Sequence, residues 1–242
     1  MRLKLIGCRV LLREMCDACA HSPHGVDLEL LPAGLHGLGG KAMAAKIQEA
    51  VDRTPEGAYD AILLGYGLCG NGLDGLTARY ACLVAPRAHD CIALLMGSRE
   101  RYQAYFEGNP GTYYRSTGWL KRGRSLRRLA HHAMGVEDPL AALAGKYGED
   151  DGRYLYAELT RYRSRYGKLT YIETGLEPGP APIAEAAAEA ADKGWSFERL
   201  PGDLAWLRRL VAGEWAETGF VVAGAGQRIV ASHDAGVLKV QW

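Results

Sequence analysis

Short apolar segments that alternate with segments of helical spacing constrain the fold more than any other feature of this sequence. Near the N-terminus, apolar runs predict strands at residues 3–7, 26–31 and 61–64, and helical periodicity predicts helices at residues 10–20 and 41–53. Strands that are joined through helices pair in parallel by right-handed crossovers. The N-terminal part of the chain is therefore predicted to be a parallel sheet covered by helices.

The same order of elements recurs towards the C-terminus. Strands are expected at residues 169–172, 195–200 and 219–222, and helices at residues 183–193 and 204–212. We predict an α/β protein with a mainly parallel, doubly wound sheet or sheets, in which two related three-strand α/β units flank a helical insertion. Any doubly wound fold shows a similar order of strands and helices, so the sequence leaves open whether the two units are a true internal repeat.

The middle of the sequence is less regular. It predicts a strand at 81–85, a helix at 92–106, a turn-rich aromatic loop at 109–114, and amphipathic helices within 124–166. The expected division of the chain has three parts: residues 1–120, an α/β unit that carries the cysteine loops; residues 121–167, a helical bridge or cap; and residues 168–242, a C-terminal α/β unit.

Composition excludes several classes of protein. Hydrophobic residues make up 48% and charged residues 24% of the chain, and the formal net charge is +1, so neither nucleic acid nor a membrane is expected as a partner. The first residues are too charged for a signal peptide, and no apolar run is long enough to cross a bilayer. We therefore expect a cytoplasmic protein, in which the six cysteines favour metal binding or catalysis over disulfides.

Three of the cysteines lie where parallel α/β sheets place their chemistry. Cys8 ends the first predicted strand, Cys69 follows the strand at 61–64, and Cys91 follows the strand at 81–85. The carboxyl ends of parallel strands meet at one edge of the sheet, where ligands bind. Cys8, Cys69 and Cys91 are therefore predicted to ligate one metal centre, although cysteine is also a common buried core residue.

The predicted cofactor is an iron–sulfur cluster of the 4Fe–4S type. Three thiolates would leave one iron open to bind a substrate and polarise it. Zinc is the alternative and would take His89 or His36 as a fourth ligand, or leave that position for water. Cys16 and Cys19 form a C-x-x-C pair on the first helix that suits a peripheral zinc or a redox pair, and Cys82 is expected in the core.

A glycine-rich loop surrounds the second of these cysteines. Residues 65–70 match the pattern G-x-G-x-x-G, which a dinucleotide site would use only if a helix began at the loop. We favour a different role, in which Gly67 and Gly70 let the backbone wrap around the bound cofactor. Tyr66 and His36 are predicted to line the same pocket.

Polar residues stand directly before the third cysteine. His89 is predicted to move protons, Arg87 to hold an anionic group of the substrate, and Asp90 to assist His89. His89, Asp90 and Cys91 could be read as a base, its orienting partner and a nucleophile, but adjacent residues of an extended loop point in different directions, so they do not form a triad among themselves. Tyr113, Tyr114 and Trp119, like Tyr66, either wall the pocket or pack beneath the loops.

Several of these motifs together resemble a family catalogued as domain of unknown function 1638. The resemblance rests on the first-strand cysteine, the Gly-Tyr-Gly-Leu-Cys-Gly loop, the Pro-Arg-Ala-His-Asp-Cys segment and the Pro-Gly-Thr-Tyr-Tyr loop, and it extends over nearly the whole chain. The residues that it carries over are Cys8, Gly67, Cys69, Gly70, Pro86, Arg87, His89, Asp90 and Cys91. It implies an association with corrinoid-dependent methyl-transfer systems.

These observations predict a metal-dependent lyase or transferase. Its substrate would be a small polar, thiol-containing or methyl-containing molecule, with a link to one-carbon or corrinoid methyl-transfer metabolism. A non-catalytic metal or corrinoid accessory protein, a carrier protein, and a zinc-thiolate enzyme are the alternatives.

Overall fold

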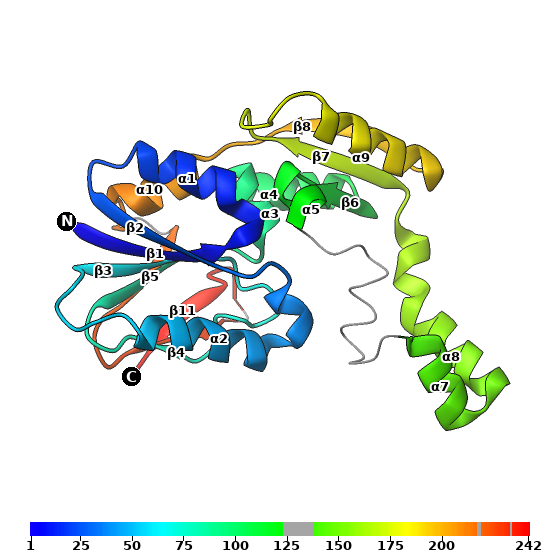
Figure 1. The fold of residues 1–242 in the computed structure, drawn as a ribbon, viewed down its shortest axis with the longest axis horizontal. Coiled ribbons are helices and arrows are strands. Elements are labelled where there is room, and N and C mark those ends of the chain that lie inside the picture. The colour runs from blue at the N-terminus through cyan, green and yellow to red at the C-terminus, as the bar shows by residue number, and fades with distance from the viewer. Residues whose placement is uncertain (123–137, 217–218, 233) are drawn as a thin grey trace.

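A mainly parallel sheet and a smaller parallel sheet organise the structure, which is a computed structural model describing residues 1–122, 138–216, 219–232 and 234–242 (Figure 1). The larger sheet carries the N-terminal half of the chain, and the smaller one lies beside it with the helix α9 (Ala181–Asp192). Parallel strands and intervening helices confirm the predicted α/β class.

The larger sheet has the strand order β2-β1-β3-β5-β9. Its strands are β2 (Gly25–Leu31), β1 (Arg2–Cys8), β3 (Ala61–Gly65), β5 (Cys82–Pro86) and β9 (Phe220–Ala223). The first four pair in parallel, while β9 pairs antiparallel with β5. The three strands predicted at residues 169–172, 195–200 and 219–222 are therefore divided between two sheets, because only the last of them joins the larger sheet.

Helices cover both faces of this sheet, which explains why its central strand β3 is apolar throughout. Every residue of β3 is buried. The helices α1 (Leu12–Ala20) and α10 (Ala205–Ala212) pack on one face, and α2 (Gly40–Asp52) packs on the other (Figure 1). A strand with two buried faces needs apolar side chains on both, so it reads as a continuous run and not as an alternation.

The smaller parallel sheet has the order β6-β7-β8. Its strands are β6 (Thr112–Arg115), β7 (Lys168–Glu173) and β8 (Ser196–Pro201). Leu169 and Tyr171 of β7 are fully buried against Ala186 and Ala190 of α9. The small alanine side chains let the helix lie close to the strands, so this sheet has a separate core.

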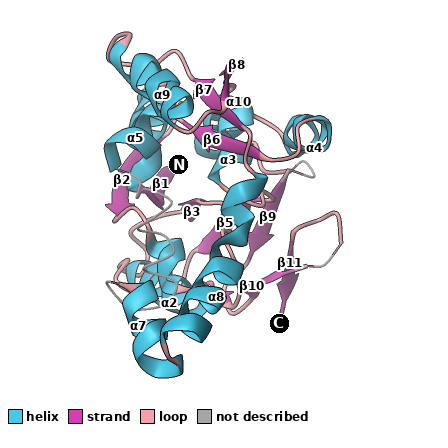
Figure 2. Ribbon diagram, turned by 90° about the vertical axis from the view of Figure 1, so that its right-hand side faces the viewer, coloured by secondary structure: helices cyan, strands magenta, loops and turns pink. Residues whose placement is uncertain are grey.

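A third, antiparallel sheet has the order β11-β10-β4. Its strands are β11 (Leu238–Gln241), β10 (Arg228–Ala231) and β4 (Leu76–Thr77). It extends the layer beneath the larger sheet, where Ile229, Val237 and Leu238 join the core that α2 covers, and Figure 2 shows β10 and β11 beside β9.

The remaining elements are short. They are η1 (Arg9–Leu11), η2 (Leu35–Leu38), α3 (Cys91–Met96), α4 (Arg99–Gly108), α5 (Thr117–Arg122), α7 (Pro139–Tyr147), α8 (Glu149–Thr160) and η3 (Arg161–Arg165). The helices α7 and α8 form a hairpin set apart from the sheets (Figure 1), and Gly148 lies at its turn. The part of the expected helical segment at residues 123–137 lies outside the described residues.

Two segments differ from the expectation. The single helix predicted at 92–106 is two helices, because Gly97 has a φ of +80° and the Ser98 hydroxyl caps α4 by accepting a hydrogen bond from the Arg101 amide. Part of the expected loop at 109–114 is strand β6, which pairs with β7. None of the described helices combines the length and the apolar character that a bilayer span requires.

Candidate functional site

The structure brings the carboxyl ends of β1, β3 and β5 together at one edge of the larger sheet. Cys8 is the last residue of β1, Cys69 lies in the loop after β3, and Cys91 begins α3 just after β5. Because these three strands are neighbours, their loops leave the sheet side by side. The geometric part of the sequence prediction, that the three cysteines gather at one edge, agrees with this topology.

The two cysteine-bearing loops are hydrogen bonded to each other. The Leu68 amide donates to the Ala88 carbonyl at 2.8 Å, and the Cys69 amide donates to the His89 carbonyl at 2.8 Å. A Cβ atom at Gly67 would lie 2.6 Å from the backbone of Asp90, which is too close for any side chain. Gly67 is therefore required by the close approach of the two loops.

The backbone is strained at the second cysteine. Cys69, Gly70 and Asn71 have φ values of 46°, 70° and 70°, so three consecutive residues are left-handed. This conformation costs a residue other than glycine about 1–2 kcal/mol. Such strain persists where the surrounding structure holds it, and it is found often at functional sites. Here the turn holds the Cys69 side chain at the sheet edge.

Asp90 fixes the third cysteine. One carboxylate oxygen of Asp90 accepts hydrogen bonds from the Ile92 and Ala93 amides, at 2.9 and 3.1 Å, and the other accepts one from the Tyr102 hydroxyl at 3.2 Å. Burial raises the pKa of Asp90, and these hydrogen bonds oppose the rise. Asp90 therefore caps α3 and positions Cys91; its predicted assistance to His89 is not among these contacts.

The pKa values of the three thiols are raised, chiefly because the thiols are buried. Burial raises the pKa of Cys69 to about 12, with further increases from the charges of Asp90 and Cys8. The pKa of Cys91 is raised by burial and then by Cys69, Asp90 and Cys8, and burial also raises that of Cys8. Without a positive partner the thiols stay protonated, since each thiolate would repel the others in a site of low dielectric constant.

Hydrogen-bond donors nevertheless point at the sulfur atoms. Main-chain hydrogen bonds from Val10 and Gly34 favour the thiolate of Cys8, and the Trp119 side chain does the same for Cys91. Main-chain hydrogen bonds at Gly67 and Cys91 act on Cys69. Donors of this kind stabilise thiolate charge and tune metal centres that thiolates hold.

Aromatic side chains close the site. Tyr66 is 2% exposed, and its buried hydroxyl has no hydrogen-bond partner among the described residues. Its pKa is raised by burial and by the nearby Cys8 and Cys69. Trp119 of α5 contacts Cys91 on one side and the ring of His36 on the other, with ring centroids 5.6 Å apart. Tyr66, His36 and Trp119 thus lie around the thiols.

Other predicted site residues lie elsewhere. His89 is exposed at the rim. Arg87 donates hydrogen bonds to the carbonyls of Phe220, Gly236 and Leu238, which belong to the C-terminal segment. The proton-transfer and anion-binding roles of these two residues stay predictions. Tyr113 packs in the smaller core against Tyr166 and Trp195 and does not reach the thiols.

The remaining cysteines are separate from this site. Cys82 begins β5 at the opposite edge of the sheet, where its thiol donates to the Asp60 carbonyl at 3.7 Å. Cys16 and Cys19 lie on α1, exposed and partly buried respectively. Cys82 therefore lies at the start of β5, and Cys91 lies after the loop that follows this strand. Only Cys91 belongs to the site.

Two alternatives for the site can be compared with the geometry. The loop at residues 65–70 runs into turns and β4, so it lacks the helix N-terminus on which a dinucleotide phosphate would rest. Across the described residues, no group of three or more histidine, cysteine or acidic side chains is arranged to hold a single metal ion. A cluster binds each thiolate through a different iron and accepts more widely spaced sulfur atoms.

Sequence reasoning missed the Asp90 cap, and it named Trp119 without indicating that this side chain would reach Cys91. The Asp90 cap was visible as an aspartate directly before a helical run, whereas the predicted helix began one residue too late. The contact between Trp119 and Cys91 had no local signal, because a backbone approach brings α5 to η1: a Cβ atom at Gly118 would lie 1.7 Å from the Val10 carbonyl oxygen.

Comparison with known proteins identifies a family but no activity. A family model described as protein of unknown function (DUF1638) matches residues 30–211, which include Cys69 and Cys91 but not Cys8 or the strands β9 to β11. The match is shorter than the nearly complete coverage expected from the motifs. No curated protein and no solved structure gives a significant match. The family match covers most of the chain, and the protein therefore belongs to the DUF1638 family.

Proposed function

We propose that this protein is an enzyme that holds an iron–sulfur cluster on Cys8, Cys69 and Cys91. Its substrate would be a small polar, thiol-containing or methyl-containing molecule. The observation that carries this proposal is the gathering of three buried or partly buried thiols at adjacent strand ends, where Cys8 raises the pKa of both Cys69 and Cys91. A link to corrinoid methyl transfer rests on the family resemblance alone.

The donor set fits such a group. Protonated thiols with raised pKa values are poor nucleophiles, since the thiolate is the reactive form. A bound metal deprotonates its thiol ligands outright and supplies the positive charge that three neighbouring thiolates require. When bound through three thiolates, the cluster would supply an open iron that acts as a Lewis acid.

The chain's own residues would then shape the pocket. The unpartnered hydroxyl of Tyr66 can donate a hydrogen bond to the cofactor or to a substrate oxygen. Trp119 would exclude water on the side of Cys91, and Asp90 would keep Cys91 at the start of α3. His89, at the exposed rim, is suited to exchange protons with solvent.

The test is anaerobic purification of the wild type, Cys69→Ala and Cys82→Ala, with absorbance spectra and analysis of iron, sulfide and zinc. Cys82 is the matched control, because it is a partly buried cysteine of the same sheet at the opposite edge. Brown wild-type and Cys82→Ala protein with a band near roughly 400 nm, together with colourless Cys69→Ala protein, would support the cluster.

Other results would change or reject the proposal. Stoichiometric zinc that is lost only in Cys69→Ala would make the protein a zinc-thiolate protein. Metal-free wild type after cluster reconstitution, or equal metal in all three proteins, would reject the site. Metal without turnover of any small thiol or methyl donor would favour an accessory or carrier protein over an enzyme.

A further inference from the structure

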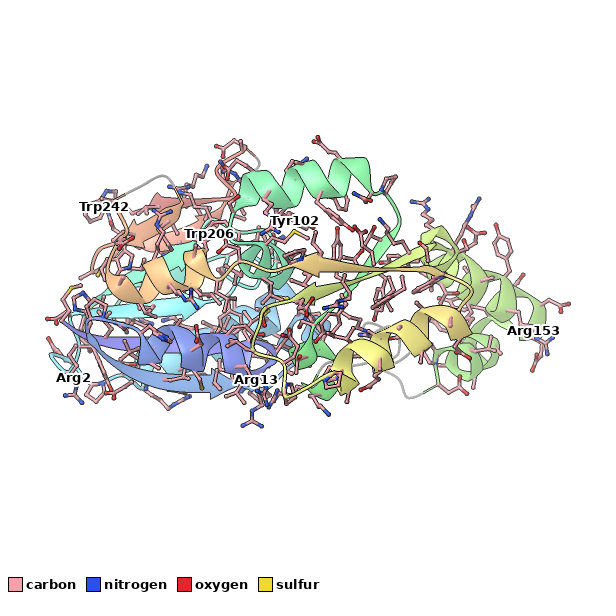
Figure 3. The ribbon with its side chains drawn as sticks, turned by 90° about the horizontal axis from the view of Figure 1, so that it is seen from above. Arg2, Arg13, Tyr102, Arg153, Trp206 and Trp242 are labelled. Atoms are coloured by element: carbon pink, nitrogen blue, oxygen red, sulfur yellow. The ribbon has the colours of Figure 1, made fainter. Side chains whose placement is uncertain are left out.

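A polar cavity with a volume of about 250 Å³ lies beside β9, an outer strand of the larger sheet, and is separate from the cysteine site. Arg87 reaches it from the loop after β5, Ser98 and Arg99 from the start of α4, and Trp206 and Arg209 from α10. Figure 3 labels Trp206 in this region. The cavity is thus built by segments that are far apart in the sequence.

Three guanidinium groups line this cavity, and main-chain carbonyls hold two of them. Arg87 donates to the carbonyls of Phe220 at 2.9 Å, of Gly236 at 3.1 Å, and of Leu238. Arg99 donates to the carbonyl of Ala235 and, at 3.1 Å, to the carboxylate of Glu100. Carbonyl acceptors orient a guanidinium group without neutralising it, so the Arg87 side chain is positioned and still carries its charge. The ion pair of Arg99 with the largely exposed Glu100 is screened by solvent and compensates the charge of Arg99 only in part.

The third guanidinium group, that of Arg209, lies 5.7 Å from the ring centroid of Phe220 and 3.6 Å from the Glu214 carboxylate. Its side chain is 32% exposed and that of Arg99 is 31% exposed, whereas the Glu100 and Glu214 side chains are 61% exposed or more. The carboxylates beside the cavity therefore point largely to solvent, while the cations are more enclosed.

Charge and size together indicate what the cavity accepts. Among its described lining residues, three arginines stand against the single carboxylate of Glu100. The N-terminus of α4, a helix of ten residues capped by Ser98, adds a positive partial charge. The volume is somewhat below that of typical small-molecule pockets, which begin at about 300 Å³, so the ligand is small.

We propose that this cavity is a binding site for a small phosphoryl oxyanion, either inorganic phosphate or the phosphate group of a small metabolite, held by Arg87, Arg99 and Arg209 with Trp206 as one wall. A guanidinium group presents two parallel N–H donors that match the oxygens of a phosphate. The site is separate from the cysteine edge. Arg87, which follows β5, would bind an anion in this cavity beside β9 and not at the cysteines. The anion site does not depend on the proposed metal centre.

The experiment is isothermal titration calorimetry of inorganic phosphate into the wild type, Arg99→Gln, Arg209→Gln and Arg208→Gln in a low-salt chloride buffer. Arg208 is the matched control, since it adjoins Arg209 but forms an ion pair with Asp17 at 2.9 Å on α1. We expect saturable binding that weakens about tenfold in the Arg99 and Arg209 variants, as loss of a charged hydrogen bond predicts, and is unchanged in Arg208→Gln.

Controls separate binding from folding and from general charge. Circular dichroism must show that each variant is folded, and Arg99→Lys, which keeps the charge but loses the paired donors, should recover only part of the affinity. Sulfate should compete and acetate should not; acetate that binds as well as phosphate would overturn the phosphoryl assignment. No saturable heat in the wild type, or equal weakening in Arg208→Gln, would overturn the site.

Discussion

The carboxyl edges of the two parallel sheets have the same architecture but opposite chemistry. In the larger sheet this edge holds the thiols of Cys8, Cys69 and Cys91 beneath aromatic side chains. In the smaller sheet it holds ion pairs: Arg115 binds Glu189 of α9, and Arg199 binds Glu173. The thiols at the edge of the larger sheet are uncharged and can become anions. The charged side chains at the edge of the smaller sheet are already paired with opposite charges.

This difference shows that a strand end becomes a candidate ligand site only when its polar or ionisable side chains lack a partner within the protein. At the smaller sheet, the Arg115 guanidinium makes two hydrogen bonds to Glu189, of 2.7 and 2.8 Å, and Lys193 adds a third contact. At the larger sheet, three thiols and the Tyr66 hydroxyl have no comparable ionic partner among the described residues.

The largest effect is expected from removing the charge at the smaller edge. Arg115→Met should lower the free energy of unfolding by about 3–5 kcal/mol, because it leaves Glu189 partly buried without its main partner. Urea denaturation measures this loss. Arg199→Met, at an exposed pair, is the control and should leave the midpoint nearly unchanged; equal losses in both variants would contradict the comparison.

A smaller but more specific effect is expected at the cysteine edge. Gly67→Ala should destabilise the protein by about 1–3 kcal/mol and lower its metal content, because the new methyl group would meet the Asp90 backbone. Gly175, in the loop after β7, has open space around it and a φ of +78°. Gly175→Ala should therefore cost only the left-handed strain, about 1–2 kcal/mol, and leave the metal content unchanged.

A carboxylate between the two sheets should behave in the opposite way to Glu189. Glu14 of α1 is 1% exposed, and one of its oxygens has no partner among the described residues. Burial is the main cause of its raised pKa. Its stabilising contribution is thus present below the unfolded-state pKa, about 4.3, and is lost as the pH rises through the folded-state pKa.

Glu14→Gln should therefore raise the stability at neutral pH by about 1 kcal/mol, the scale of a buried unsatisfied group, and give no gain near about pH 4. For Glu189, hydrogen bonds from Arg115 and Lys193 outweigh burial and hold the pKa below its usual value. Glu189→Gln should lose stability at neutral pH and lose none at low pH. Urea denaturation between these pH values checks both signs.

The smallest effect is expected for thiols outside the sheet edge. Cys16→Ser should change neither the metal content nor the unfolding midpoint, because Cys16 is exposed on α1. Elemental analysis and thermal denaturation beside the wild type measure both quantities. A drop in metal content would show that the C-x-x-C pair takes part in metal binding.

Much of the fold could be predicted because its signals are local. The apolar run of β3 and the alanine-rich α9 appear where periodicity predicts them. The break between α3 and α4 was not predicted, because only two residues, Gly97 and Ser98, interrupt an otherwise helical pattern there. Strand β6 was expected as a loop because the turn residues Asn109, Pro110 and Gly111 stand directly before it, although its threonine and tyrosines favour a strand and pair with β7.

By itself, the sequence determined the order of most strands and helices and the position of three cysteines at or just beyond strand ends, because hydrophobic periodicity and turn residues act over short distances. Only the tertiary structure decided that β9 joins the larger sheet antiparallel to β5, that Trp119 reaches Cys91, and that Arg87 binds carbonyls near the C-terminus. These contacts join residues remote in sequence, and a local pattern does not specify which distant surface will bury it.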